Sequence, residues 1–290
     1  MILPNVIMIG AHKAGTTSLY DWLIQHPNIF GPEGMKDFPF FCDDGYFQKG
    51  EAWFNRNYFL RKNEKIILHG CVNYLYFSNI AANRIYQNNP SVKIIAVLRN
   101  PVDRAYSANW QQKKIGHEDL ETFELAIQKE QARLCGEFQE RANLTYIDHG
   151  FYSRQLSYYY KMFPRNNIKV MIFEEMIANK GAALKDVFEF LGVNQDFVPQ
   201  FSVKNESGAA RSRLVQSLLL KPIVPNFIKK MMPITFRVSA KNVLRRINTR
   251  QVVYQPLGRD MRLRLMNLYK DDISELEKML HRDLRSVWGL

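Results

Sequence analysis

The chain has 290 residues, 46% of them hydrophobic, which is enough to bury the core of one large α/β domain or of two small ones. Lysine and arginine number 40 against 28 acidic residues, and the formal charge of +12 suits a polyanionic ligand, a nucleic acid or an anionic surface. Three cysteines without a CxxC pair argue against a disulfide scaffold or a zinc site, and they favour a reduced, cytoplasmic protein.

The amino-terminal residues do not predict a signal peptide. Residues 1–10 lack a basic segment, and the apolar stretch VIMIG runs directly into a glycine-containing loop. We expect a short buried strand over 5–10 and a helix over 16–27 that stops at Pro27. No apolar run reaches the roughly 18 residues that a transmembrane helix needs, so stable membrane association is not expected.

Apolar runs and amphipathic segments alternate through most of the remaining chain. The run VKIIAVLRNP is almost entirely apolar, as expected of a parallel strand covered on both faces. The alternation predicts the α/β class, with one domain over 1–290 built on a central parallel sheet flanked by helices. The expected strands are 65–70, 92–101 and 168–176, and the expected helices are 79–90, 101–114, 121–141, 151–163, 183–192 and about 259–280.

Residues 203–258 are the least regular part of the sequence and are rich in basic residues, proline and asparagine. We expect them to form a mobile cover over a site. Within them, 217–232 is apolar but is interrupted by Pro222 and Pro225 and carries three lysines. This pattern favours a core or lid helix over a segment that lies on a membrane surface.

The loop sequence GAHKAGTTSLY follows the first expected strand and is close to a phosphate-binding loop. Gly10, Gly15 and Thr17 match the pattern G-x-x-x-x-G-K-[ST]. Thr16 replaces the lysine of that pattern, and Lys13 stands earlier in the loop. A strand, a glycine turn and a helix start gather backbone N–H groups at the positive end of a helix dipole. The loop therefore predicts a phosphate or sulfate site, with a tight turn and ordinary helix caps as the alternative.

A second motif, LRNPVDRAYS, follows the strand expected at 92–101. An NTPase would place an acidic residue at such a strand end to help hold Mg²⁺, but this strand ends in Arg99, which would attract another phosphate. If Pro101 begins a helix, Ser107 lies about two turns in, where it can donate to the phosphate that Arg99 binds in a bidentate manner. The alternative for Arg99 is a salt bridge at the strand end. We predict a phosphate compound held without a metal.

The two motifs together resemble those of the 3′-phosphoadenosine 5′-phosphosulfate (PAPS)-dependent sulfotransferases. KAGTTSLY is similar to the 5′-phosphosulfate loop of that family, and LRNPVDRAYS is similar to its 3′-phosphate motif. The similarity continues through 150–176, through NESGAARSR and to the carboxyl terminus, so it covers nearly the whole chain. The chain resembles the glycosaminoglycan and bacterial branch of the family more than the cytosolic phenol and steroid branch. The clue is KDFPFF, which is similar to the Lys-Glu-x-x-Phe-Phe motif typical of the first branch.

The resemblance implies PAPS as the donor, its desulfated form PAP as the product, and no metal. It also implies a P-loop-like phosphosulfate loop, a catalytic base on the acceptor side and a lysine that stabilises the leaving phosphate. By position, the 5′-phosphosulfate would be held by Lys13, Ala14, Gly15, Thr16, Thr17 and Ser18, and the 3′-phosphate by Arg99 and Ser107. Other parts of the cofactor would be held by Tyr152 and Arg211. Asp37 would be the base, and Lys36 would lie beside the acceptor.

Three departures from the family pattern concern the acceptor side and the cofactor cover. Asp37 is one methylene shorter than the glutamate of the family, and Gly70 is followed by Cys71 where the family often has Gly-Glu. The Lys-Gly-Arg form of the covering loop is missing around Arg211. We expect the phenylalanines next to Asp37 to supply the apolar surroundings that a carboxylate base needs. The possible rival bases are His12, His26, His69 and His149, and the main competitors are His12, in the loop, and His69, at a strand end.

The predicted function is transfer of a sulfuryl group from PAPS to a hydroxyl or amine of a small molecule. A secondary metabolite such as an alkaloid is the first choice of acceptor, and a carbohydrate is the second. A Mg²⁺-dependent P-loop kinase is the alternative enzyme, and a basic nucleic-acid-binding module is the alternative without catalysis. Because the cations at Lys13 and Arg99 converge on strand ends and form no separate stripe, no nucleic-acid partner is expected. The oligomeric state stays open.

Overall fold

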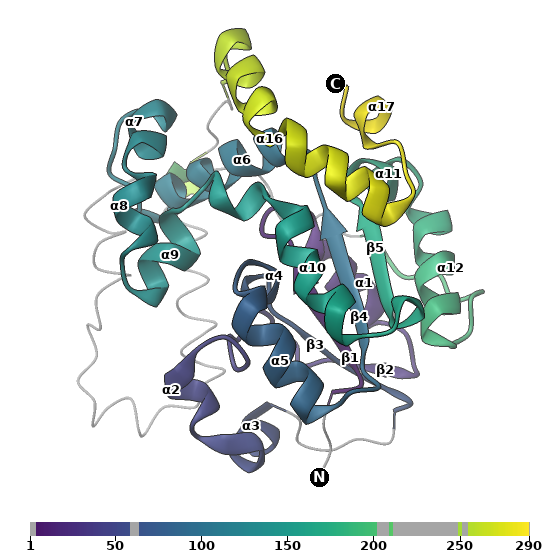
Figure 1. Ribbon diagram of the computed structural model, residues 1–290. Coiled ribbons are helices and arrows are strands. Elements are labelled where there is room, and N and C mark those ends of the chain that lie inside the picture. The colour runs from purple at the N-terminus through teal and green to yellow at the C-terminus, as the bar shows by residue number, and fades with distance from the viewer. Residues whose placement is uncertain (1–3, 59–63, 202–208, 211–248, 251–254, 290) are drawn as a thin grey trace.

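The computed structural model of the protein describes residues 4–58, 64–201, 209–210, 249–250 and 255–289. A five-stranded parallel sheet with the order β2-β3-β1-β4-β5 forms the centre (Figure 1). This confirms the predicted α/β class with a parallel sheet and flanking helices. The strands are β1 (Val6–Gly10), β2 (Ile29–Phe30), β3 (Ile66–Gly70), β4 (Lys93–Leu98) and β5 (Ile168–Ile172).

The three inner strands are buried on both faces, which explains why their sequences show no polar alternation. Every residue of β1 and β3 is buried, and in β4 only Lys93 is partly exposed. The strands predicted at 5–10 and 65–70 are therefore confirmed, and the strand predicted at 92–101 is confirmed over Lys93–Leu98. The edge strand β2 was not predicted, because two residues are too short for a periodic signal.

Helices cover both faces of the sheet. In Figure 1, α5 and α10 lie in front of the strands and α1 lies behind them. Within the part of the chain that is described, no helix has the length and apolar character that crossing a membrane requires. The helices are α1 (Thr16–Leu23), α2 (Asp44–Phe47), α3 (Gly50–Tyr58), α4 (Asn73–Tyr76), α5 (Ser78–Asn88), α6 (Pro101–Ile115), α7 (Phe123–Gln128), α8 (Glu130–Leu134), α9 (Phe138–Leu144), α10 (Tyr152–Met162), α11 (Phe173–Ala178), α12 (Lys180–Leu191), α16 (Arg259–Leu280) and α17 (Leu284–Trp288).

A long helical region was predicted over 121–141. The segment is helical, but it is divided into α7, α8 and α9. The Glu130 carboxylate accepts hydrogen bonds from the backbone N–H groups of Tyr146, Ile147 and Asp148. A buried carboxylate with three backbone donors fixes the orientation of α8, and its partners lie too far along the chain to be read from periodicity.

The strand predicted over 168–176 ends earlier, at Ile172, and the next residues form α11. The side chain of Glu174, in the first turn of that helix, accepts from the Asn100 N–H at 3.0 Å and from Trp288 Nε1 at 3.1 Å. Contacts with two distant segments thus accompany the helical conformation. The helix predicted over 16–27 also ends early, at Leu23.

The predicted cover at 203–258 and the apolar segment at 217–232 fall largely or wholly outside the described residues. Within the cover, the structure describes the short antiparallel pair β6 (Ala209–Ala210) and β7 (Thr249–Arg250), together with residues 255–258.

Candidate functional site

A cavity of about 750 Å³ opens at the carboxyl ends of β1, β3 and β4. In parallel α/β sheets this edge is where ligands bind. The two predicted anion motifs and the predicted acceptor-side pair all contribute to its wall. The predicted site residues that line it are Lys13, Gly15, Thr16, Thr17, Ser18, Lys36, Asp37, Arg99 and Ser107.

The loop between β1 and α1 presents uncapped backbone donors to the cavity. Helix α1 begins at Thr16, and its N-cap, Gly15, has φ 76° and no side chain that could bond the first N–H groups. A Cβ at Gly15 would lie 2.8 Å from the Phe173 ring and 2.9 Å from Met176 Cε, so only glycine fits this approach. The free N–H groups and the helix dipole make this end of α1 a suitable site for an anion.

Lys13 supplies a positive charge from within the loop. Its Nζ donates to Gln111 Oε1 at 3.4 Å, and its carbonyl accepts from Arg99 Nη1 at 3.1 Å. Burial lowers the pKa of Lys13 to about 8, and the positive charges of Arg99 and Lys114 add to the effect. The cations here repel one another, so an anion bound between them would relieve the repulsion.

Arg99 is held from several sides at the end of β4. Its guanidinium lies 4.9 Å above the centre of the Phe173 ring, and its carbonyl accepts from Tyr152 Oη at 2.9 Å. The next residue, Asn100, caps α6 by accepting from the N–H groups of Val102 and Asp103. The cap fixes where α6 starts, and Ser107 on that helix faces the cavity that Arg99 also lines.

Lys36 and Asp37 form an ion pair that lines the same cavity. Lys36 Nζ lies 2.8 Å from Asp37 Oδ1, and the side chains are 8% and 44% exposed. The Asp37 N–H donates to the Gly70 carbonyl at 2.8 Å, and Asp37 Oδ1 accepts from the Val72 N–H at 3.1 Å. These bonds attach the loop to the end of β3 and hold Asp37 at φ 75°, where few non-glycine residues are found.

The phenylalanines that follow Asp37 do not surround its carboxylate, contrary to the prediction. Phe40 and Phe41 are fully buried, and Phe40 stacks on Phe54 with 4.1 Å between ring centres. Phe38 packs edge-on against Tyr46 at 4.5 Å. The rings belong to the core beneath the loop, because burial of their large apolar surface stabilises the folded protein.

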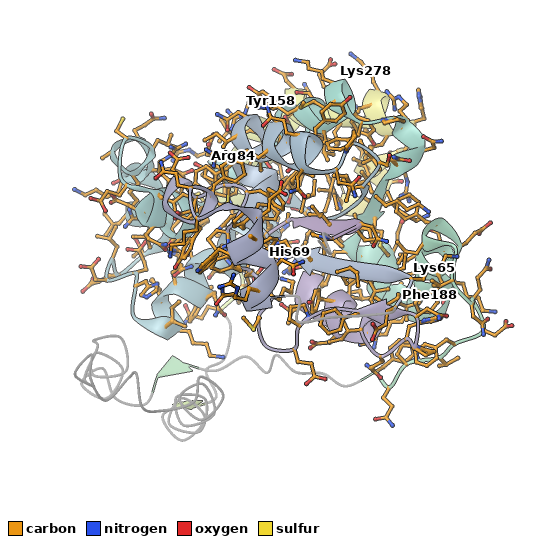
Figure 2. All side chains as sticks on the ribbon, turned by 90° about the horizontal axis from the view of Figure 1, so that it is seen from below. Lys65, His69, Arg84, Tyr158, Phe188 and Lys278 are labelled. Atoms are coloured by element: carbon orange, nitrogen blue, oxygen red, sulfur yellow. The ribbon has the colours of Figure 1, made fainter. Side chains whose placement is uncertain are left out.

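The two candidate histidines have different surroundings. His69 is buried within the body of the molecule (Figure 2), with Nε2 2.8 Å from Tyr74 Oη, and burial lowers its pKa to about 3. It does not line the cavity, which argues against its role as an acceptor-side base. His12 does line the cavity. Burial, followed by the charge of Lys13, lowers its pKa well below the usual value.

Two predicted cofactor contacts do not line the cavity, and a third is not described. Ala14 is fully buried behind the loop. Tyr152 is also fully buried, and its hydroxyl already bonds the Arg99 carbonyl, so it supports Arg99 and does not line the cavity. Arg211 lies outside the described residues.

The apolar part of the wall was not predicted from the sequence. It includes one face of α11 and the start of α12, where Phe173, Met176, Ile177 and Lys180 follow helical spacing. The spacing is visible in FEEMIANK, but that segment was interpreted in part as a strand. Two rings from segments distant in the sequence, Trp22 and Phe201, also line the cavity. Phe201 packs edge-on against Trp22, with 5.2 Å between ring centres. Gln111 was also missed.

Comparison with known proteins gives a consistent set of similarities. A family model described as "Sulfotransferase domain" matches residues 3–219. The chain is 24% identical over 289 residues, 97% of its length, to the human bifunctional heparan sulfate N-deacetylase/N-sulfotransferase 3, of which the match covers 30%. It is 29% identical over 196 residues to the human heparan sulfate glucosamine 3-O-sulfotransferase 3B1, a match that covers 67% of this chain and 47% of that protein.

Among solved structures, a sulfotransferase from Alicyclobacillus acidocaldarius is similar over the full length of both chains, with a TM-score of 0.74 and 27% identity. The chain thus spans less than half the length of the two human relatives but matches the bacterial structure from end to end.

Proposed function

The chain belongs to the sulfotransferase domain family, and we propose that it transfers the sulfuryl group of PAPS to an amine or hydroxyl acceptor. The observation that carries this proposal is that two separate groups of residues suited to anions line one cavity. The loop from Lys13 to Ser18 suits the 5′-phosphosulfate, and Arg99 with Ser107 suits the 3′-phosphate. A nucleotide phosphorylated at both positions matches this pair of sites better than a nucleoside triphosphate does.

The apolar residues of the cavity wall favour a site for the adenine ring, located between the two proposed phosphate sites and the solvent. Phe173 lies beneath Arg99, next to the proposed 3′-phosphate site, and Met176 and Ile177 extend the same surface. Flat aromatic bases stack on such side chains, with a contribution of about 1–3 kcal/mol per base in single-stranded nucleic acid binding. We propose that Trp22 and Phe201 form the other side of this slot.

The reaction proposed for the cavity is an in-line displacement at sulfur. The acceptor oxygen or nitrogen forms a bond to sulfur while the bond from sulfur to the bridging phosphate oxygen breaks. The electron pair of that bond stays on the phosphate, where Lys13 and the N–H groups of α1 stabilise it. The acceptor proton passes to Asp37, which is the proposed base, and Lys36 lies beside the acceptor.

The acceptor class is proposed from the relatives. Both human relatives are named for heparan sulfate, one as an N-sulfotransferase and one as a 3-O-sulfotransferase. These names favour an amine or hydroxyl of a carbohydrate, and a small natural product stays the alternative. Cytoplasmic location and a single domain over 1–290 likewise stay proposals.

Thermal unfolding with PAP tests the donor site without any knowledge of the acceptor. A ligand that binds only the native state raises the melting temperature. PAP should do so in the presence of EDTA, and ATP with Mg²⁺ should do much less. Equal stabilisation by ATP with Mg²⁺, or loss of the PAP effect on adding EDTA, would favour the kinase alternative.

A further inference from the structure

His12 occupies a place in the cavity that neither the donor phosphates nor the acceptor-side ion pair uses. It precedes Lys13 in the loop between β1 and α1, and it lines the cavity together with Lys36 and Asp37. Neither ring nitrogen is hydrogen-bonded to another residue that the structure describes. The ring lies 6.4 Å from that of His149, which is stacked on Tyr76 at 3.6 Å.

The groups around His12 keep its imidazole neutral. Burial, followed by the charges of Lys13, His149, Arg104 and Lys36, holds the pKa of His12 well below its usual value. The Asp37 carboxylate on the same wall is ion-paired with Lys36 at 2.8 Å, so it offers His12 little compensation. A neutral imidazole has one N–H donor and one lone pair. A sulfate oxygen is only an acceptor, so it can bond to the N–H but not to the lone pair.

We propose that His12 is a further catalytic residue, whose ring N–H donates a hydrogen bond to an oxygen of the sulfuryl group during transfer. This inference rests on the proposed function. The sulfuryl group would lie between the leaving oxygen at Lys13 and the acceptor at Asp37. His12 is next to Lys13 in sequence and shares its wall with both of the acceptor-side residues.

A neutral donor suits this position better than another cation. The charge that grows during the reaction lies on the bridging oxygen, where Lys13 already acts. The sulfuryl oxygens therefore need no second cation. A neutral N–H can orient the three sulfuryl oxygens for in-line attack through a hydrogen bond that is kept throughout the transfer.

Two other roles for His12 give different results in the same experiment. A structural role in the loop would affect PAP and PAPS equally, because both place a phosphate at Lys13. A role as general base would leave the binding of both nucleotides unchanged and would lower only the turnover. The proposed role alone makes the difference between PAPS and PAP depend on His12.

The experiment compares equilibrium binding of PAP and of PAPS, without an acceptor, to the wild-type chain and to His12 variants. His12→Phe keeps a ring and removes the donor, and His12→Asn keeps an N–H. We expect His12→Phe to weaken PAPS binding about tenfold or more, the size of one hydrogen bond to a charged group, with PAP affinity within about twofold. His12→Asn should recover most of the loss, and His281→Phe, at an exposed position, should change neither.

Equal weakening of both nucleotides by His12→Phe, or no change in either, would overturn the assignment. If the phenylalanine variant is unfolded, the smaller His12→Leu removes the donor in its place, and the same two comparisons decide. Failure of PAP to bind the wild-type chain would instead refute the proposed function, so the two ideas fail in different ways.

Discussion

The lowered pKa of Lys13 predicts that the affinity for PAP falls as the pH rises above about 8. In the free protein Lys13 titrates with a pKa of about 8, because it is buried beside Arg99 and near Lys114. A phosphate at this lysine favours the charged form, so binding raises the pKa back towards its ordinary value of about 10.4. PAP then binds the protonated form, and any neutral lysine must first take up a proton.

The magnitude follows from the free-state value. With a pKa of about 8, the protonated fraction falls from about nine-tenths at pH 7 to about one-tenth at pH 9. The dissociation constant of PAP should therefore rise about tenfold over this interval, equivalent to about 1.4 kcal/mol. The phosphate groups of PAP lose their last protons near pH 6 and contribute little above pH 7.

Isothermal titration calorimetry at pH 7, 8 and 9 measures this effect, and two buffers with different ionisation enthalpies report the proton uptake. Lys13→Arg is the matched control, because arginine stays charged over the whole range and should give a nearly flat profile. An affinity that is independent of pH in the wild-type chain, or that falls equally in Lys13→Arg, would show that titration of Lys13 does not control PAP binding.

Three substitutions test other parts of the site. Arg99→Ala should weaken PAP binding by about 2–4 kcal/mol in a titration, since it removes a charge-assisted pair, and a loss below about threefold would contradict its role. Asp37→Asn should leave PAP affinity nearly unchanged and lower kcat about 10²–10⁴-fold at saturating PAPS, whereas more than about a tenth of the activity remaining would exclude it as the base. Gly15→Ala should lower the melting temperature and PAP affinity more than Gly34→Ala, because both have positive φ but only the first methyl group meets Phe173, at 2.8 Å; equal effects would remove the steric argument.

The part of the cavity that is proposed to bind PAPS could be predicted because its geometry is local in the sequence. A buried strand, a glycine turn and a helix start put Lys13 and Thr16 at the end of β1 by chain order alone. The RNP sequence after β4 likewise fixes Arg99 at the strand end, and Asn100 and Pro101 fix the helix that carries Ser107. Short-range rules thus place both anion motifs on one edge of the sheet.

The rest of the site depends on contacts between distant segments. No local pattern brings Phe201 against Trp22 or Gln111 to Lys13, because these pairs are separated by more than ninety residues. The environment of Asp37 could not be predicted either. The neighbouring phenylalanines were expected to surround its carboxylate. They pack instead into the core, where Phe40 stacks on Phe54.

Transfer of label from ³⁵S-labelled PAPS tests most directly whether this chain is a PAPS-dependent sulfotransferase. The acceptor panel should contain oligosaccharides with free amines or hydroxyls, together with hydroxyl- and amine-bearing natural products. We expect labelled product and stoichiometric PAP with at least one acceptor without added metal. Both should be lost in Lys13→Ala, which removes the charge that stabilises the leaving phosphate. Label that stays in PAPS across the whole panel, or turnover that Lys13→Ala leaves intact, would contradict this expectation.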